Sequence, residues 1–222
     1  MAGTEQRPRR RTPLTRDRVL HAAVRLADKG GLQSLSMRKL GQALGVEAMS
    51  LYKHVADKED ILDGLVDAVF GEIGLPPGDE NWRTAMRDRA ISARQVLLRH
   101  PWAIGLLDSR RNAGPATIRH HDAVIGSLRR AGFSVEMAAH TFSLLDSYIY
   151  GFALQQSSLP FDPEEVSQAA ATMLPGARAA AYPYFTEMLT EFAGKPDYSY
   201  DAEFDFGLDL ILDGLEHARS AI

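Results

Sequence analysis

The stretch ALGVEAMSLYKHVADKED gathers side chains suited to polar ligands, among them Ser50, Tyr52, Lys53 and Lys58. Hydroxyl and ammonium groups at this density match the phosphate oxygens and polar base edges of nucleic acids. Catalysis has less support, because the chain contains no glycine-rich phosphate loop, no HExxH zinc motif and no recognisable Ser–His–Asp grouping. These residue types therefore favour a polyanion-binding surface over an active site.

Basic side chains are concentrated in the first part of the chain. Residues 1–60 carry 12 Lys/Arg against 7 Asp/Glu, a net charge of +5, which leaves −9 for the rest of a chain whose total is −4. A basic head on an acidic body indicates that only the head meets a polyanion. Since the 222 residues include no cysteine, no long apolar run and no secretory leader, we expect a cytoplasmic protein without disulfides.

Short helices must hold the polar stretch in place. Ser36 is a predicted N-cap for a helix over Met37–Leu44, Gly45 ends that helix, and a third helix is predicted from about Glu47 to His54. Two short helices joined by a glycine turn are typical of the helix-turn-helix motif, whose second helix enters the major groove of DNA. A helix of this length is unstable alone, so we expect its apolar side chains to pack against the flanking helices.

Helical patterns fill the remainder of the chain. Further helices are expected to start at Thr15, Asp57 and Asp162–Pro163 and to cover about 82–99, 102–109, 115–131, 135–157, 177–192 and 202–219. Because no segment alternates as a strand does, the predicted fold is all-α. The Pro/Arg-rich start of the chain predicts a flexible basic arm over 1–14. The linker GLPPGDEN separates a predicted helix-turn-helix domain over 15–74 from a larger predicted helical domain over 81–222.

A family resemblance runs through nearly the whole chain. The segment TPLTRDRVLHAAVRLADKGGLQSLSMRKLGQALGVEAMSLYKHVADKEDILDGLVDAVF resembles the DNA-binding domain of the TetR-type transcriptional repressors, most specifically at the LGVxxxxLYxHVxxK pattern. A weaker likeness to the tetracycline-repressor branch follows in ENWRTAMRDRAISARQVLLRHP, RRAGFS and FDFGLDLILDGLE. The resemblance implies a helix-turn-helix head joined to an effector-binding and dimerisation domain.

The resemblance also implies which residues meet DNA. They are Arg38, Lys39, Glu47, Ala48, Met49, Ser50, Tyr52, Lys53, His54 and Lys58. Ala48 and Met49 replace polar and proline residues of the tetracycline repressor, so the operator should differ. In the arm, Arg7 and Arg9–Arg11 either add minor-groove and phosphate contacts or form a solvated tail.

An effector cavity is expected between three helices of the acidic part. Its expected lining combines apolar walls with a few polar groups, namely Arg89, Trp102, Leu107, Arg110, His121, Phe142, Asp146, Ile149 and Gln155. For each polar residue, a surface position or an ordinary ion pair is an equal alternative. The family's magnesium-binding histidine aligns with Leu107, and His100, His120, His121 and His140 form no recognisable ligand set, so no metal or other cofactor is expected.

The apolar-rich segments Ala139–Leu154 and Phe204–Leu215 match the family's four-helix dimer interface, with an ordinary monomer core as the alternative. We therefore expect a ligand-responsive repressor that binds a palindromic operator as a homodimer and is released by a small-molecule effector. The effector would move the short helix after His100–Pro101, which would push on the fourth helix. The alternatives are a DNA-binding dimer without effector control and a helical-bundle enzyme.

Overall fold

The computed structural model describes residues 13–78, 81–107, 109–110, 112–160, 162, 165–173 and 180–220, and every regular element in these ranges is helical. The predicted all-α class is confirmed. The arginines of the basic arm, the predicted helix start at Pro163 and the first residues of the predicted helix 177–192 lie outside the described residues.

The head consists of α1 (Arg16–Gly30), η1 (Leu32–Ser34), α2 (Met37–Leu44), α3 (Ala48–Leu51) and α4 (Lys58–Glu72). Three predicted N-caps are confirmed, because the side chains of Thr15, Ser36 and Asp57 accept hydrogen bonds from backbone N–H groups of the first turns of α1, α2 and α4. Gly45 ends α2 with φ 68° and ψ 34°, a left-handed conformation that glycine adopts without strain.

The third helix is shorter than predicted. Its α-helical part spans four residues, and turns continue the chain through His54. The backbone N–H groups of Ser50 and His54 bond the carbonyls three residues earlier, at Glu47 and Leu51, so the segment winds more tightly than an α-helix at both ends. The predicted range of 47–54 is correct as a helical segment but wrong as one continuous α-helix.

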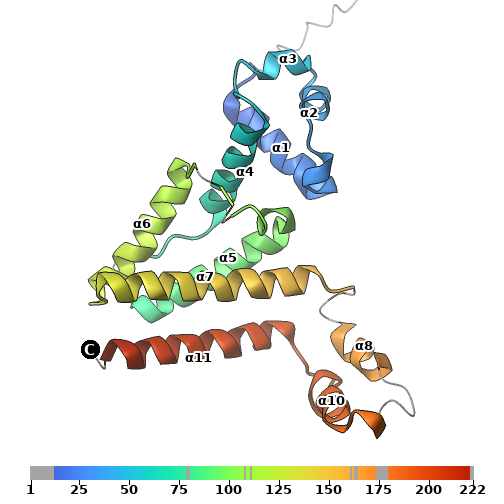
Figure 1. Cartoon of the computed structure of the whole chain (residues 1–222), viewed down its shortest axis with the longest axis vertical. Helices are drawn as coiled ribbons and strands as arrows, with labels where there is room; N and C mark the ends of the chain where they lie inside the picture. Colours follow the sequence, from blue (N-terminus) through green and yellow to red (C-terminus); the bar gives the residue numbers. More distant parts are fainter. Residues whose placement is uncertain are drawn as a thin grey trace, which may run out of the picture.

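The body contains the remaining elements. They are α5 (Trp82–Arg99), η2 (Pro101–Ala103), α6 (Pro115–Arg130), α7 (Val135–Ser157), α8 (Val166–Met173), α10 (Pro183–Met188), the π-helical turn η4 (Leu189–Ala193) and α11 (Tyr200–Ser220). The helix predicted over 102–109 is wrong beyond residue 103, where turns replace it. In Figure 1, α7 and α11 lie side by side at the lower edge of the layer, α5 crosses α7, and the head stands above them on α4.

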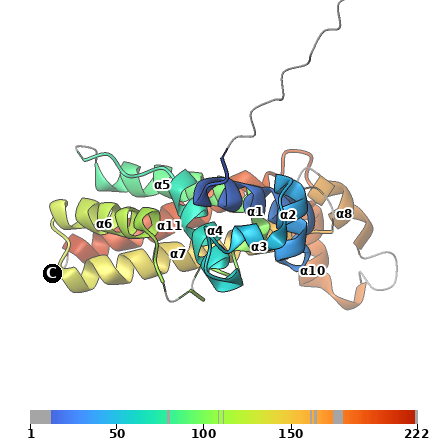
Figure 2. The ribbon, with the colours of Figure 1, turned by 90° about the horizontal axis from the view of Figure 1, so that it is seen from above.

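Two hydrophobic clusters hold the molecule together, and α4 contributes to both. Ile61 and Leu65 pack into the head cluster with α1, α2 and α3, whereas Val69 and Phe70 pack into the body cluster with α5, α6 and α7. Seen from above, the head sits over the layer of body helices (Figure 2). The predicted domain bounds stay a prediction, but this shared helix is a direct mechanical link between the two cores. Within the described residues, no helix is long and apolar enough to cross a membrane.

Candidate nucleic-acid interface and buried polar centre

Close packing supports α3 against α2. Leu51 and Val55 are buried with Leu40 in the head cluster. A Cβ atom on Gly41 of α2 would lie 2.8 Å from the carbonyl oxygen of Val46 and 3.1 Å from the backbone nitrogen of Ala48, so only glycine permits this approach. The expected tertiary support for the short recognition segment is therefore present.

The predicted DNA-binding residues lie on one accessible part of the head. Met49 is 75% exposed and Tyr52 is 47% exposed, although both are large apolar or aromatic side chains. Arg38, Lys39, Glu47, Lys53 and Lys58 are also exposed, and Ala48, Ser50 and His54 are half-buried. We call these ten residues the recognition surface.

The cations of the recognition surface differ from those of the body in their partners. Within the part of the chain that the structure describes, Arg38, Lys39, Lys53 and Lys58 make no side-chain hydrogen bond or ion pair. In the body, by contrast, Arg83 and Arg87 of α5 pair with Asp205, Asp209 and Asp213 of α11. Charge on the recognition surface is thus available to an external anion, whereas these body charges are neutralised internally.

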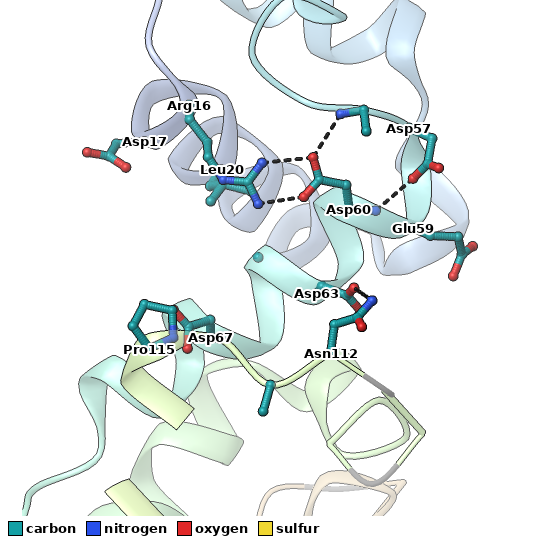
Figure 3. A pocket seen from close by; sticks show the side chains of 14 residues that line it. Arg16, Asp17, Leu20, Asp57, Glu59, Asp60, Asp63, Asp67, Asn112 and Pro115 are labelled. Carbon is teal, nitrogen blue, oxygen red and sulfur yellow. Dashed lines mark hydrogen bonds and ion pairs between the residues drawn. The ribbon is translucent and has the colours of Figure 1, made fainter. Parts of the chain in front are cut away.

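An ion pair fixes the end of the recognition segment to α1. Arg16 donates to both carboxylate oxygens of Asp60, at 2.8 and 2.6 Å, and one of those oxygens also accepts from the backbone nitrogen of Ala56 (Figure 3). The hydrogen bond from Arg16 holds the pKa of Asp60 below its usual value. Both ends of the segment are therefore anchored, which positions its exposed side chains.

Polar contacts link α4 to the segment that starts α6. Asp63 accepts from Arg110 at 2.6 Å and from Asn112 at 2.9 Å, and Arg110 also pairs with Glu59 at 2.9 Å. One turn further along α4, Asp67 accepts from the backbone nitrogen and the hydroxyl of Thr117. We call this set the junction clasp. It borders a hollow of about 520 Å³ between α1, α4 and the residues before α6 (Figure 3).

A second set of contacts joins η2 to the head. Asp28 of α1 accepts from Trp102 Nε1 and contacts His100 Nδ1, both at 2.7 Å, and His100 Nε2 lies 3.3 Å from Glu72 of α4. Trp102 therefore belongs to the head–body junction.

The polar centre of the body consists of Arg89 on α5, His120 on α6, and Asp146 and Tyr150 on α7. Arg89 Nη2 donates to Asp146 Oδ1 at 2.5 Å, and Arg89 Nε donates to His120 Nε2 at 3.2 Å. Tyr150 donates to the other oxygen of Asp146 at 3.1 Å. Burial, followed by the charge of Arg89 and the neighbouring His121, lowers the pKa of His120 to about 3, so its ring is neutral at physiological pH.

Aromatic rings border this centre. His121 lies 5.0 Å from Phe142 and 5.2 Å from Phe70 between ring centroids, and the guanidinium carbon of Arg89 lies 5.7 Å from the Phe142 centroid. Leu107 and Ile149 are buried in the surrounding body cluster. The structure therefore gathers Arg89, Asp146, His121 and Phe142 of the predicted pocket.

Three predicted pocket residues lie elsewhere. Trp102 contacts the head, Arg110 is held by two carboxylates of α4, and the side chain of Gln155 is exposed. The sequence did not distinguish these three residues from pocket-lining ones, because a helical pattern does not show which neighbouring element supplies the hydrogen-bond or ion-pair partner. As pocket-lining groups these three are not brought together with Arg89.

His120, Tyr150, Phe70 and the buried hydroxyl of Thr141 were not predicted here. The spacing of Thr117, His120 and Val124 puts the three residues on one helical face, which could have indicated a buried histidine. In the structure all three are buried. The four histidines do not share one site, because His100 lies at the junction, His120 and His121 lie at the polar centre, and His140 lies near Glu136 on the surface. Among the described residues, no group of three or more His, Asp or Glu side chains could hold a metal ion.

The outer faces of α7 and α11 are apolar and exposed. Phe206 and Leu210 of α11 are 67% and 58% exposed, and Leu144 and Leu154 of α7 are about half exposed. On their inner faces the two helices already pack, with Tyr148 donating to the carbonyl of Phe204 at 2.8 Å. An exposed apolar surface spread over two adjacent helices is typical of a protein–protein interface.

Comparison with known proteins matches two family models to the chain. Residues 19–65 match the family described as bacterial regulatory proteins of the tetR family, and residues 75–219 match the tetracyclin repressor-like C-terminal domain. The chain is 34% identical over 212 residues to an HTH-type transcriptional regulator of Saccharopolyspora erythraea, covering 95% of this chain and 88% of that protein. It is 33% identical to the HTH-type transcriptional repressor DrrR1 of Streptomyces coeruleorubidus, with 96% and 82% covered.

A solved structure shows the same architecture. ActR of Streptomyces coelicolor, in complex with (S)-DNPA, superposes with a TM-score of 0.75 at 28% identity, covering 94% of this chain and all of that one. Family matches over both parts, and relatives above 30% identity along nearly the full length, agree with the helix-turn-helix head found in the structure. The chain belongs to the TetR family of transcriptional regulators.

Proposed function

We propose that this regulator is a repressor that inserts the recognition surface into successive major grooves of a palindromic operator and leaves it when a small molecule binds the body. The observation that carries the proposal is the exposed row of Met49, Tyr52 and Lys53 on a segment anchored at both ends. A large exposed apolar side chain beside an unpaired lysine suits contacts with base edges and phosphates.

Tyr52 and Lys53 are assigned to phosphate contacts, and Ala48, Met49 and Ser50 to base edges. Arg38, Lys39 and Lys58 flank them at the first turns of α2 and α4, where backbone N–H groups add a favourable field for a phosphate. Glu47 and His54 lie at the two ends of the recognition segment. These roles follow from side-chain reach and exposure.

Two copies of the chain are needed to read a palindrome. We assign the dimer interface to the exposed apolar residues of α7 and α11. These two helices lie side by side in the body (Figure 1). Joining two heads converts the second binding event into an intramolecular one, which raises the affinity for two half-sites at a fixed spacing.

The effector site is assigned to the polar centre and its aromatic border. Support comes from the buried polar side chains on three helices, and from ActR, whose structures were solved with (S)-DNPA and with actinorhodin. A change in α6 reaches the head through the junction clasp, because Asp67 and Asp63 tie α4 to the start of α6. Control of DNA binding then requires only that the effector binds the released form more tightly.

The proposal is tested by fluorescence anisotropy with the full chain and labelled duplex DNA. Affinity should fall steeply between about 50 mM and 200 mM salt, because phosphate contacts release counterions. Lys53→Ala should reduce the slope, whereas Lys195→Ala, which removes an exposed charge far from the head, should leave it unchanged. Equal slopes for the two variants, or no binding at any salt, would overturn the proposal.

A further inference from the structure

The polar centre contains unused hydrogen-bonding atoms. Among the described residues, Arg89 Nη1, His120 Nδ1 and Thr141 Oγ1 are buried side-chain atoms without a hydrogen-bond partner. Arg89 is 2% exposed, and His120 and Thr141 are fully buried. A buried polar atom left without a partner is costly, so three of them on the facing helices α5, α6 and α7 point to a group that completes the centre.

The contacts of Arg89 fix the proton on His120. A guanidinium nitrogen only donates, so His120 Nε2 must accept the hydrogen bond from Arg89 Nε. In a neutral imidazole the other nitrogen then carries the hydrogen, and the low pKa of His120 keeps the ring neutral. His120 Nδ1 is thus an N–H donor, as is Arg89 Nη1, and both lack an acceptor.

Each carboxylate oxygen of Asp146 already has one donor. Asp146 Oδ1 accepts from Arg89 and Asp146 Oδ2 accepts from Tyr150. The charge of Arg89 is balanced by Asp146, so the centre needs no counter-charge from a ligand. The atoms of the centre left without a partner are two N–H donors and the hydroxyl of Thr141, which is able to act in either role.

We propose that the effector presents a neutral acceptor oxygen, of the carbonyl type, on a flat apolar frame to the Arg89 Nη1 and His120 Nδ1 donors. The flat frame follows from the rings of Phe70, His121 and Phe142 around the centre, since aromatic faces and edges pack well on planar molecules. Phe142 and His121 are only half-buried, which makes their side the route of entry. This inference rests on the proposed effector site and specifies the chemistry of its ligand.

The two unpaired N–H donors should discriminate between amines, hydrocarbons and carbonyl compounds. An aliphatic amine would place three donors and a positive charge beside the guanidinium of Arg89 and leave both N–H groups without an acceptor, so it should bind poorly. A hydrocarbon of the same shape would gain the apolar contacts but leave both N–H groups unpaired. Only an acceptor oxygen satisfies them.

The test compares three molecules on each of two frames, using the full chain without DNA. The probes are 9-fluorenone, fluorene and 9-aminofluorene, and the smaller 1-indanone, indane and 1-aminoindane, measured by calorimetry. In at least one frame the ketone should bind about tenfold or more tightly than its hydrocarbon and its amine, the expected effect of hydrogen bonds to a charged and a neutral donor. A preference for the amines, equal affinities, or no ketone binding up to its solubility would overturn the inference.

Substitutions at Arg89 and His120 test whether these two donors cause the ketone preference. Arg89→Lys keeps the charge opposite Asp146 but lacks Nη1, and His120→Leu lacks Nδ1, so each should reduce the ketone preference. His120→Gln offers an acceptor to Arg89 and a donor to the ligand, so it should retain that preference. If Arg89→Lys does not fold, the His120→Leu and His120→Gln pair decides, and an unchanged preference in His120→Leu contradicts the proposal.

The outcome is separable from that of the proposed function. Salt-dependent DNA binding is therefore measured in parallel on the unaltered chain in the absence of probe. Retained salt-dependent DNA binding without a ketone preference would refute only the ligand chemistry. A ketone preference in a chain that never binds DNA would refute only the proposed function.

Discussion

Individual side chains of the recognition surface should divide into two functional kinds. Tyr52 lies at the end of the helical segment with its ring about half exposed, whereas Met49 projects from the first turn of α3. In the proposed complex, the Tyr52 hydroxyl contacts a phosphate and the Met49 side chain contacts the apolar part of a base edge.

Tyr52→Phe should therefore weaken binding to every sequence by a similar factor, about fivefold for the loss of one hydrogen bond. Met49→Gln should change which base is preferred at one position of each half-site, with less effect on binding to random DNA. Anisotropy titrations against an operator and its single-base variants distinguish the two. An altered base preference in Tyr52→Phe, or none in Met49→Gln, would contradict the assignment.

Buried His120 makes stability depend on pH. Its pKa is about 3 in the folded chain, whereas the ordinary value of 6.5 applies in the unfolded chain. Between these two values the unfolded chain binds more protons, so the free energy of unfolding falls as the pH falls. At pH 5 the loss is about 2 kcal/mol, from 1.36 kcal/mol per pKa unit. Chemical denaturation at pH 7 and pH 5 measures it. In His120→Gln, which cannot titrate at this position, the decrease in the free energy of unfolding between pH 7 and pH 5 should be smaller by about that amount. An equal decrease in both proteins would refute this role of His120.

Sequence patterns identified residue types better than residue partners. Arg89 and Asp146 were both assigned to the pocket, and the structure pairs them. Arg110 was assigned there too, yet Glu59 and Asp63 of α4 hold it at the junction. Periodicity tells which side of its own helix a residue occupies, but the partner depends on how helices distant in sequence cross, and this is decided by packing of the whole core.

At the scale of elements, local capping signals gave reliable helix starts. Thr15, Ser36, Asp57, Asn81 and Ser134 each cap the helix predicted to follow, because the cap is a contact between residues only two or three apart. Where no such local contact exists the prediction was weaker. The helix expected over 102–109 is a 3₁₀ turn followed by further turns, since its shape depends on the contacts of Trp102 with α1.

The start of α6 depends on another helix. Its own N-cap position, Gly114, has no side chain, and Asp67 of α4 accepts from the backbone nitrogen of Thr117 instead. A Cβ atom on Gly114 would collide with Asp67, so the two elements are closely fitted. This cap borrowed from α4 makes the first turn of α6 sensitive to the position of the helix that carries the head.

Asp67→Ala should lower the free energy of unfolding by about 1 kcal/mol, the usual cost of losing an N-cap. It should also weaken the link between the body and the head, so that effector binding releases DNA less completely. Chemical denaturation and effector titrations of the DNA complex measure the two effects. Asp67→Asn keeps an acceptor oxygen and is the matched control. If both variants behave like the unaltered chain, the clasp at Asp67 is not part of the coupling.

At the scale of the whole molecule, the proposed dimer interface lies on the exposed apolar residues of α7 and α11. Phe206→Asp combined with Leu210→Asp places two charges in the proposed interface, and burying an unpaired charge is costly, so the dimer should dissociate. Sedimentation velocity should show a monomer, and affinity for a two-site duplex should fall by about a hundredfold or more as avidity is lost. Ile118→Asp, an equally exposed apolar position on α6, is the control. A dimer that survives the double substitution would place the interface elsewhere.

The central claim is that two anchored recognition segments read DNA together, and selection from a random duplex library tests it most directly. The full chain should enrich an inverted repeat whose half-sites lie about one helical turn, ~34 Å, apart. The Met49→Gln protein should enrich the same spacing with altered bases inside each half-site. Enrichment of single sites without symmetry, of sequences indifferent to Met49, or of no sequence at all would contradict the account.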